Sequence, residues 1–196
     1  MKSRLLFLPI WVLLSITIFS QEQMSAEKFS QIVSTPGDRT PLSEKLAAFP
    51  FWTNSTADIF LRYEDERTFK EDAVITAKTI SGKYIVFTIQ SKFYEQPINS
   101  IVMYDKEKLA FAVWGKYGDM LTEQIATFDF EKKTYKTSSS YGDGFTETGS
   151  GFYSDKEDSS RTLVYKNGTL FMTREVKAKP VEIIEIAVHH CSHIGR

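Results

Sequence analysis

The residues best suited to chemistry lie together at the C-terminus. The chain ends in VHHCSHIGR, which holds all three histidines, His189, His190 and His193, and the only cysteine, Cys191. If the last strand runs to the end of the chain, His189, Cys191 and His193 share one face, with alternate residues about 6.6–7 Å apart. Imidazole and thiolate groups are ligands of zinc and copper. A metal site at these three residues is therefore one interpretation of the segment.

Two other interpretations of this segment stay open. His190 falls on the opposite face of the same strand, where it could be an axial ligand to haem in an apolar barrel. Alternatively, the strand ends near Val188 and the remaining residues fray, because chain termini are poorly ordered unless something holds them. No acidic residue stands beside the histidines to orient them. The leading interpretation is the frayed end, with no cofactor.

Motifs for other chemistry are missing from the sequence. It has no phosphate-binding glycine loop followed by lysine, no Gly-x-Ser-x-Gly, no His-Glu-x-x-His and no Cys-x-x-Cys. A histidine-dependent catalytic triad would have to recruit the tail. We assign no catalytic residue and favour a non-enzymatic protein. An enzyme with a carboxylate site at the barrel mouth is the alternative.

The composition bounds the class of protein. The chain has 196 residues, of which 42% are hydrophobic and 25% charged, as in an ordinary folded domain. Its formal net charge of -1 predicts no nucleic-acid partner. A single cysteine excludes an intramolecular disulfide framework. No feature of the sequence indicates an oligomeric state.

The N-terminus has the layout of a secretory signal peptide over residues 1–20. Lys2 and Arg4 precede an apolar run from Leu5 to Leu14, and Ser20 is a small residue suited to the cleavage point. The apolar stretch is shorter than the roughly 20 residues of a membrane span, so we expect no transmembrane span after signal removal. The protein is predicted to be secreted or periplasmic, and an uncleaved anchor is the alternative.

The rest of the chain divides into an extension, one domain and a tail. Residues 21–40 form a peripheral N-terminal extension, residues 41–190 a β-barrel domain and residues 191–196 a C-terminal tail. Within the domain, Leu42, Leu46 and Phe49 fall on one face of a short helix that Pro50 ends. We expect this helix to cover something apolar.

From residue 52 onward the hydrophobic pattern has a period of two. Ala57, Ile59, Leu61 and Tyr63 share one face, and similar runs occur at 83–93, 98–104, 109–115, 121–128, 133–140, 161–166, 169–176 and 181–190. Turn residues such as Asn167-Gly168 separate them. About ten short strands without a long helix predict an all-β fold, an antiparallel lipocalin-like barrel with a short N-terminal helix.

Residues 137–151 interrupt the pattern and are interpreted as a loose hairpin tip, or alternatively as a polar flap over the barrel mouth.

Several short motifs occur in an order that resembles a known family. They are LAAFPFW, then SGKYIVFTIQSKFYEQPINSIVMYDKEKLAFAVW, then ATFDFEKKTYK. Together they resemble the bacterial domain of unknown function 1579 family, whose members look like lipocalin-type barrels. The matching positions, spread over roughly residues 42–190, are Trp52, Gly82, Tyr84, Tyr104, Asp105, Trp114, Phe128 and Asp129. The resemblance implies a fold, because the family has no settled activity.

Aromatic residues of these motifs are the candidates to line a ligand cavity: Trp52, Tyr84, Tyr104 and Trp114. A structural role is the simpler interpretation, with Trp52 closing the barrel floor and Asp105 accepting backbone N–H bonds at a turn. The leading prediction is an exported lipocalin-like barrel that binds a small apolar molecule in its lumen.

Overall fold

The computed structural model describes residues 24–51, 54–92, 95–117 and 120–181. These residues form two short helices and ten strands. The elements are α1 (Ala26–Ser34), α2 (Glu44–Ala47), β1 (Ser55–Tyr63), β2 (Thr68–Ile80), β3 (Tyr84–Ser91), β4 (Ile98–Asp105), β5 (Ala110–Tyr117), β6 (Met120–Asp129), β7 (Thr134–Ser140), β8 (Phe145–Tyr153), β9 (Asp158–Lys166) and β10 (Thr169–Pro180).

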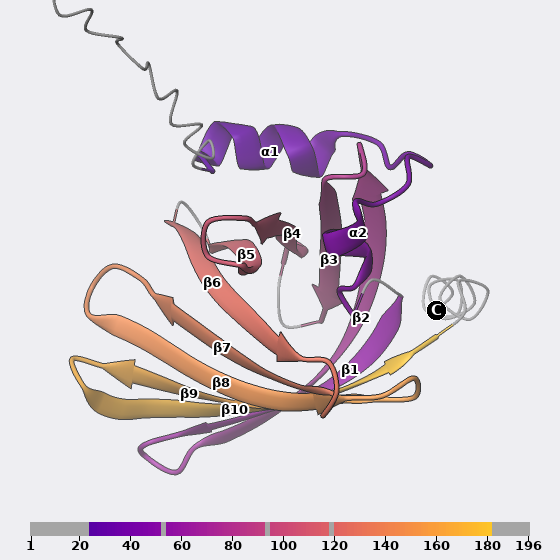
Figure 1. Cartoon of the computed structure of the whole chain (residues 1–196). Helices are drawn as coiled ribbons and strands as arrows, with labels where there is room; N and C mark the ends of the chain where they lie inside the picture. The colour runs from indigo at the N-terminus through magenta and orange to yellow at the C-terminus, as the bar shows by residue number, and fades with distance from the viewer. Residues whose placement is uncertain (1–23, 52–53, 93–94, 118–119, 182–196) are drawn as a thin grey trace, which may run out of the picture.

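The ten strands close into one antiparallel barrel (Figure 1). Each strand pairs with the next along the chain, and β1 pairs with β10 from Ser55 opposite Pro180 to Tyr63 opposite Met172. Closure leaves neither β1 nor β10 with an unpaired edge, which protects a sheet protein from edge-to-edge association. The predicted all-β barrel is confirmed.

Side chains alternate between the interior of the barrel, called the lumen here, and its outer surface. On β1 the predicted face of Ala57, Ile59, Leu61 and Tyr63 lines the lumen. On β3, Ile85 and Phe87 belong to the interior core, whereas Val86 belongs to a separate cluster beneath α1. The period-two pattern therefore gives the correct orientation of these strands.

Two strands do not follow the sequence prediction. β2 and β8 are missing from the predicted runs, because neither has a continuous apolar alternation. The interpretation of residues 137–151 as a loose tip is wrong, since β7 and β8 pair from Thr134 opposite Phe152 to Ser140 opposite Thr146. The turn itself is confined to residues 141–144. Of the predicted last strand, residues 182–190 lie outside the described residues.

The segment around α2 closes one end of the barrel, called the plug end here. Leu46 and Phe49 are buried among inward side chains of β3, β4 and β5. The ring centroid of Phe49 lies 5.1 Å from that of Phe111 and 5.6 Å from that of Phe128. The expectation that Leu46 and Phe49 cover something apolar is confirmed.

The helix α1 packs on the outside of the barrel, above β3–β5 in Figure 1. Its buried residues Phe29 and Ile32 contact a cluster that includes Val86 and Ile101. The ammonium group of Lys78 donates hydrogen bonds of 2.7 Å to the carbonyl oxygens of Val33 and Thr35. A lysine at this position complements the partial negative charge of a helix C-terminus. Neither of the described helices is long and apolar enough to cross a membrane.

Candidate functional site

The half of the barrel away from the plug end is hollow. A cavity of about 600 Å³ lies there, called the lumen cavity, and among the described residues side chains from every strand except β5 line it. It extends to the barrel end that carries the β1–β2 and β7–β8 turns, where Tyr63, Met120, Tyr141 and Phe145 line it. Met120 is 42% exposed, so solvent reaches the cavity from that end.

Small inward residues keep the lumen from being filled. The lumen cavity is lined by Thr137, Ser160 and Thr162, whereas the plug end is filled by aromatic residues. On β8, a Cβ atom on Gly149 would collide with the hydroxyl of Thr137, and one on Gly151 would lie 2.5 Å from the ring of Tyr135. The two glycines of this strand therefore make room for inward side chains of β7.

An ion pair between a buried carboxylate and a half-buried guanidinium lies on the polar wall of the lumen cavity. The guanidinium of Arg174 on β10 lies 3.3 Å from the Oε2 atom of Glu147 on β8. The same oxygen accepts a hydrogen bond of 3.4 Å from the side-chain amide of Gln124 on β6. Burial raises the pKa of the Tyr141 phenol, and the Glu147 carboxylate raises it further. The negative charge of Glu147 is thus matched inside the barrel.

A second carboxylate, Glu71 on β2, lines the same cavity. It stands opposite Ile59 of β1 and is 6% exposed. Its Oε1 atom is buried and accepts no hydrogen bond from the described residues. An acceptor buried without a donor costs about 1–3 kcal/mol, and more when it is charged. Glu71 is therefore the least satisfied polar group identified among the described residues that line the cavity.

A second chamber of about 450 Å³ lies between the lumen cavity and the plug end. It shares Ile75, Ile89 and Ser100 with the lumen cavity. Asp158 lines this chamber, and its Oδ1 atom accepts a hydrogen bond of 2.8 Å from the phenol of Tyr135, which lines the lumen cavity. Burial raises the pKa of Asp158 to about 6, and burial also raises the pKa of Tyr135.

The candidate ligand-lining residues are found in different places. Tyr104 packs against the interior core, with its ring 5.5 Å from that of Phe111. Tyr84 and Trp114 pack against the cluster beneath α1, and neither is among the side chains that line the lumen cavity. Trp52 lies outside the described residues.

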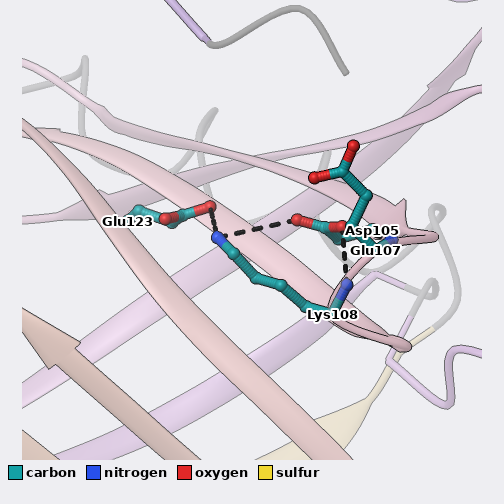
Figure 2. Close-up of polar contacts among 4 residues, drawn as sticks. All are labelled: Asp105, Glu107, Lys108 and Glu123. Carbon is teal, nitrogen blue, oxygen red and sulfur yellow. Dashed lines mark hydrogen bonds and ion pairs between the residues drawn. The ribbon is translucent and has the colours of Figure 1, made fainter. Parts of the chain in front are cut away.

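Asp105 has the structural role that its residue type predicts. Its Oδ1 atom accepts the backbone N–H groups of Glu107 and Lys108 at 2.9 and 3.0 Å, which fixes the β4–β5 turn. Figure 2 shows Lys108 between Asp105 and Glu123, with 2.8 Å from its Nζ atom to Oε1 of Glu123. The hydrogen bond with Glu123 raises the pKa of Lys108. This cluster stabilises a turn.

The other sequence predictions lie outside the described residues. The metal candidates His189, Cys191 and His193 and the haem candidate His190 belong to residues 182–196. The signal peptide over residues 1–20 is likewise not described, so export stays a prediction. Over residues 24–181, apart from the short gaps, no group of three or more His, Cys, Asp or Glu side chains could hold a metal ion.

Sequence reasoning missed the polar residues of the lumen, Glu71, Glu147, Gln124 and Arg174. The signal that could have found them is the alternation of inward and outward residues along a strand. Glu71 stands two residues from Ala73 and four from Ile75, and all three face the lumen. A charged residue at an inward position of a barrel strand marks a polar site in the interior.

No family model and no curated protein matches the chain in sequence. Solved structures do match in shape. Rv2717c from M. tuberculosis has a TM-score of 0.57 and 12% identity, over 72% of this chain and 99% of that one. A protein of unknown function of the DUF3598 family from Nostoc punctiforme has a TM-score of 0.50 and 12% identity, over 76% of this chain and 53% of its own. This chain thus spans about half the length of the Nostoc protein.

A third structure is that of the S-type phycobiliprotein lyase CPES from Guillardia theta. It has a TM-score of 0.49 and 7% identity, over 67% of this chain and 89% of that one. At these identities the likeness to the first two structures shows the lipocalin-like barrel fold alone. Membership of the domain of unknown function 1579 family stays a prediction.

Proposed function

We propose that this protein binds a small, mainly apolar molecule with one polar group in the lumen of its barrel. The observation that carries the proposal is the lumen cavity of about 600 Å³, open at one end and lined by both apolar and buried polar side chains. Cavities that bind small molecules have volumes of about 300–1,000 Å³ and a few placed polar groups in an apolar wall.

The two sides of the cavity differ in polarity, as expected for a site that binds an amphiphilic ligand. On one side, Ile59 and Leu61 of β1 and Met172 and Val176 of β10 line the cavity, with Arg174 between the last two. The facing strands β6–β9 contribute threonine, serine, glutamine and glutamate side chains. The sequence predicted an apolar ligand, and the buried charged groups add a polar end to it.

A substitution that fills the cavity tests this proposal. Ile59→Trp adds a large side chain inside the lumen, and Phe60→Trp, one residue along β1, places the same ring on the outer face. We expect isothermal titration calorimetry to detect binding of ten-carbon amphiphiles to the original protein. Ile59→Trp should weaken the binding at least about tenfold, or about 1.4 kcal/mol, and Phe60→Trp should leave it unchanged. Absence of binding, or equal binding by Ile59→Trp, would contradict lumen binding.

A further inference from the structure

The charged side chains of the lumen cavity identify the kind of polar group that it accepts. Among the described residues, three charged side chains line the cavity, two carboxylates and one guanidinium: Glu71, Glu147 and Arg174. We propose that the ligand carries an ammonium or other positively charged nitrogen, and that Glu71 receives it. This inference rests on the proposed function, because it assigns the polar end of the molecule bound in the lumen.

The guanidinium is already engaged by a carboxylate. Arg174 lies 3.3 Å from Oε2 of Glu147, and Gln124 donates to the same oxygen. An anionic ligand would have to compete with Glu147 for Arg174 and would meet two carboxylates in the same low-dielectric space. The count of charges on the cavity wall therefore disfavours an anion.

Glu71 has a hydrogen-bond acceptor that is available to a ligand. Its Oε1 atom receives no hydrogen bond from the described residues, and its side chain lines the cavity. The terminal torsion of a glutamate side chain is broad, so a rotation about it can turn either oxygen toward a bound molecule. An ammonium group has three donors and no acceptor, which matches a carboxylate oxygen without a donor.

The side chains around Glu71 indicate where the apolar part of the ligand lies. Glu71 pairs with Ile59 across β1 and β2, and Ile59 pairs with Val176 across β1 and β10. These two apolar side chains line the cavity beside the carboxylate. An alkyl chain attached to the nitrogen can therefore lie against Ile59 and Val176 while the nitrogen contacts Glu71.

Three compounds of equal chain length test this inference. Decylamine, decan-1-ol and decanoate are titrated separately into the protein at pH 7.5, each below its micelle concentration. We expect decylamine to bind at least about tenfold more tightly than decanoate, because the carboxylates of Glu71 and Glu147 attract the ammonium group and repel the carboxylate of decanoate. Glu71→Gln should weaken decylamine binding about tenfold and change decanol binding less than about threefold.

The matched control is Asp72→Asn, the same loss of charge on the neighbouring, exposed outer position of β2. It should leave all three affinities unchanged. Decanoate binding as tightly as decylamine, or decylamine binding unaffected by Glu71→Gln, would overturn the inference and leave lumen binding intact. If no compound binds, the proposed function fails as well. The comparison of amine with carboxylate uses the unmodified protein and therefore does not depend on how the variants fold.

Discussion

Asp158 illustrates at the scale of one residue how burial sets the chemistry of this barrel. Its ordinary pKa of 3.8 rises to about 6, mainly through burial, and the hydrogen bond from Tyr135 limits that rise. Between about pH 4 and pH 6 the folded protein therefore holds a proton that the unfolded chain has released. Stability falls as pH rises through this window and levels off above about pH 6.

Asp158→Asn should remove this pH dependence. The shift from 3.8 to about 6 corresponds to about 3 kcal/mol over the whole window, of which at most about 2 kcal/mol lies above pH 4.5, and partial exposure reduces this part to about 1–2 kcal/mol. We expect the free energy of unfolding of the original protein, relative to Asp158→Asn, to fall by that amount between pH 4.5 and pH 7.5. Urea unfolding at several pH values measures it.

Two further variants control this experiment. Asp155→Asn changes a carboxylate whose side chain is 98% exposed on the same turn, and its unfolding curve should run parallel to that of the original protein. Tyr135→Phe removes the donor that favours the ionised carboxylate, so the transition should move to higher pH. Parallel curves for the original protein and Asp158→Asn would show that burial does not raise this pKa.

At the scale of elements, α1 is an outer layer on a barrel that closes without it. Phe29→Ala should undock α1, because a buried phenylalanine contributes about 3–5 kcal/mol to packing. Trp114, which packs against the cluster beneath α1, should then become more accessible to acrylamide. The measurement is quenching of Trp114 fluorescence with Trp11 and Trp52 both replaced by phenylalanine.

The exposed residue Gln31 of the same helix supplies the control. Gln31→Ala removes no buried contact and should leave the quenching unchanged. The far-ultraviolet circular dichroism of Phe29→Ala should keep its strand signal. Complete unfolding of the barrel by Phe29→Ala would show that α1 is part of the cooperative core.

The elements also show how far sequence reasoning reaches. Strands such as β1 and β3 were predictable because their inward positions carry aliphatic and aromatic residues. In β2 and β8 the inward positions include Glu71, Glu147 and Gly149, so apolar alternation does not reveal the strand. The two strands that the prediction missed therefore carry two of the charged residues of the candidate site, Glu71 and Glu147.

Contacts between residues close in the sequence were predictable, whereas contacts between distant residues were not. The turn at Asp105 was predictable, because an aspartate accepts N–H groups two and three residues ahead without any tertiary structure. The pairing of Glu147 with Arg174 joins residues 27 positions apart. It depends on the register of β8, β9 and β10, and no spacing in the sequence specifies that register.

At the scale of the whole molecule, the barrel divides its interior into two parts with different roles. Aromatic side chains around Phe49 and Phe128 fill the plug end, where ring contacts supply packing energy. Small and polar side chains leave the other half hollow. Stability is thus concentrated at the plug end and in the closure of the sheet, which lets the other half keep a cavity.

Closure through β10 is therefore the feature on which the whole molecule depends. Glu175 faces outward in the middle of β10, opposite Phe60 of β1 and Arg161 of β9. Glu175→Pro removes a backbone donor from this doubly paired strand and should cost at least about 3 kcal/mol. Glu175→Ala, the control, loses only a long ion pair of 3.8 Å between exposed groups, which is worth about 0–1 kcal/mol.

Opening the barrel exposes two long strand edges, so Glu175→Pro should also elute as oligomers in size-exclusion chromatography. A monomeric Glu175→Pro protein with the urea midpoint of Glu175→Ala would show that closure between β1 and β10 contributes little to the fold.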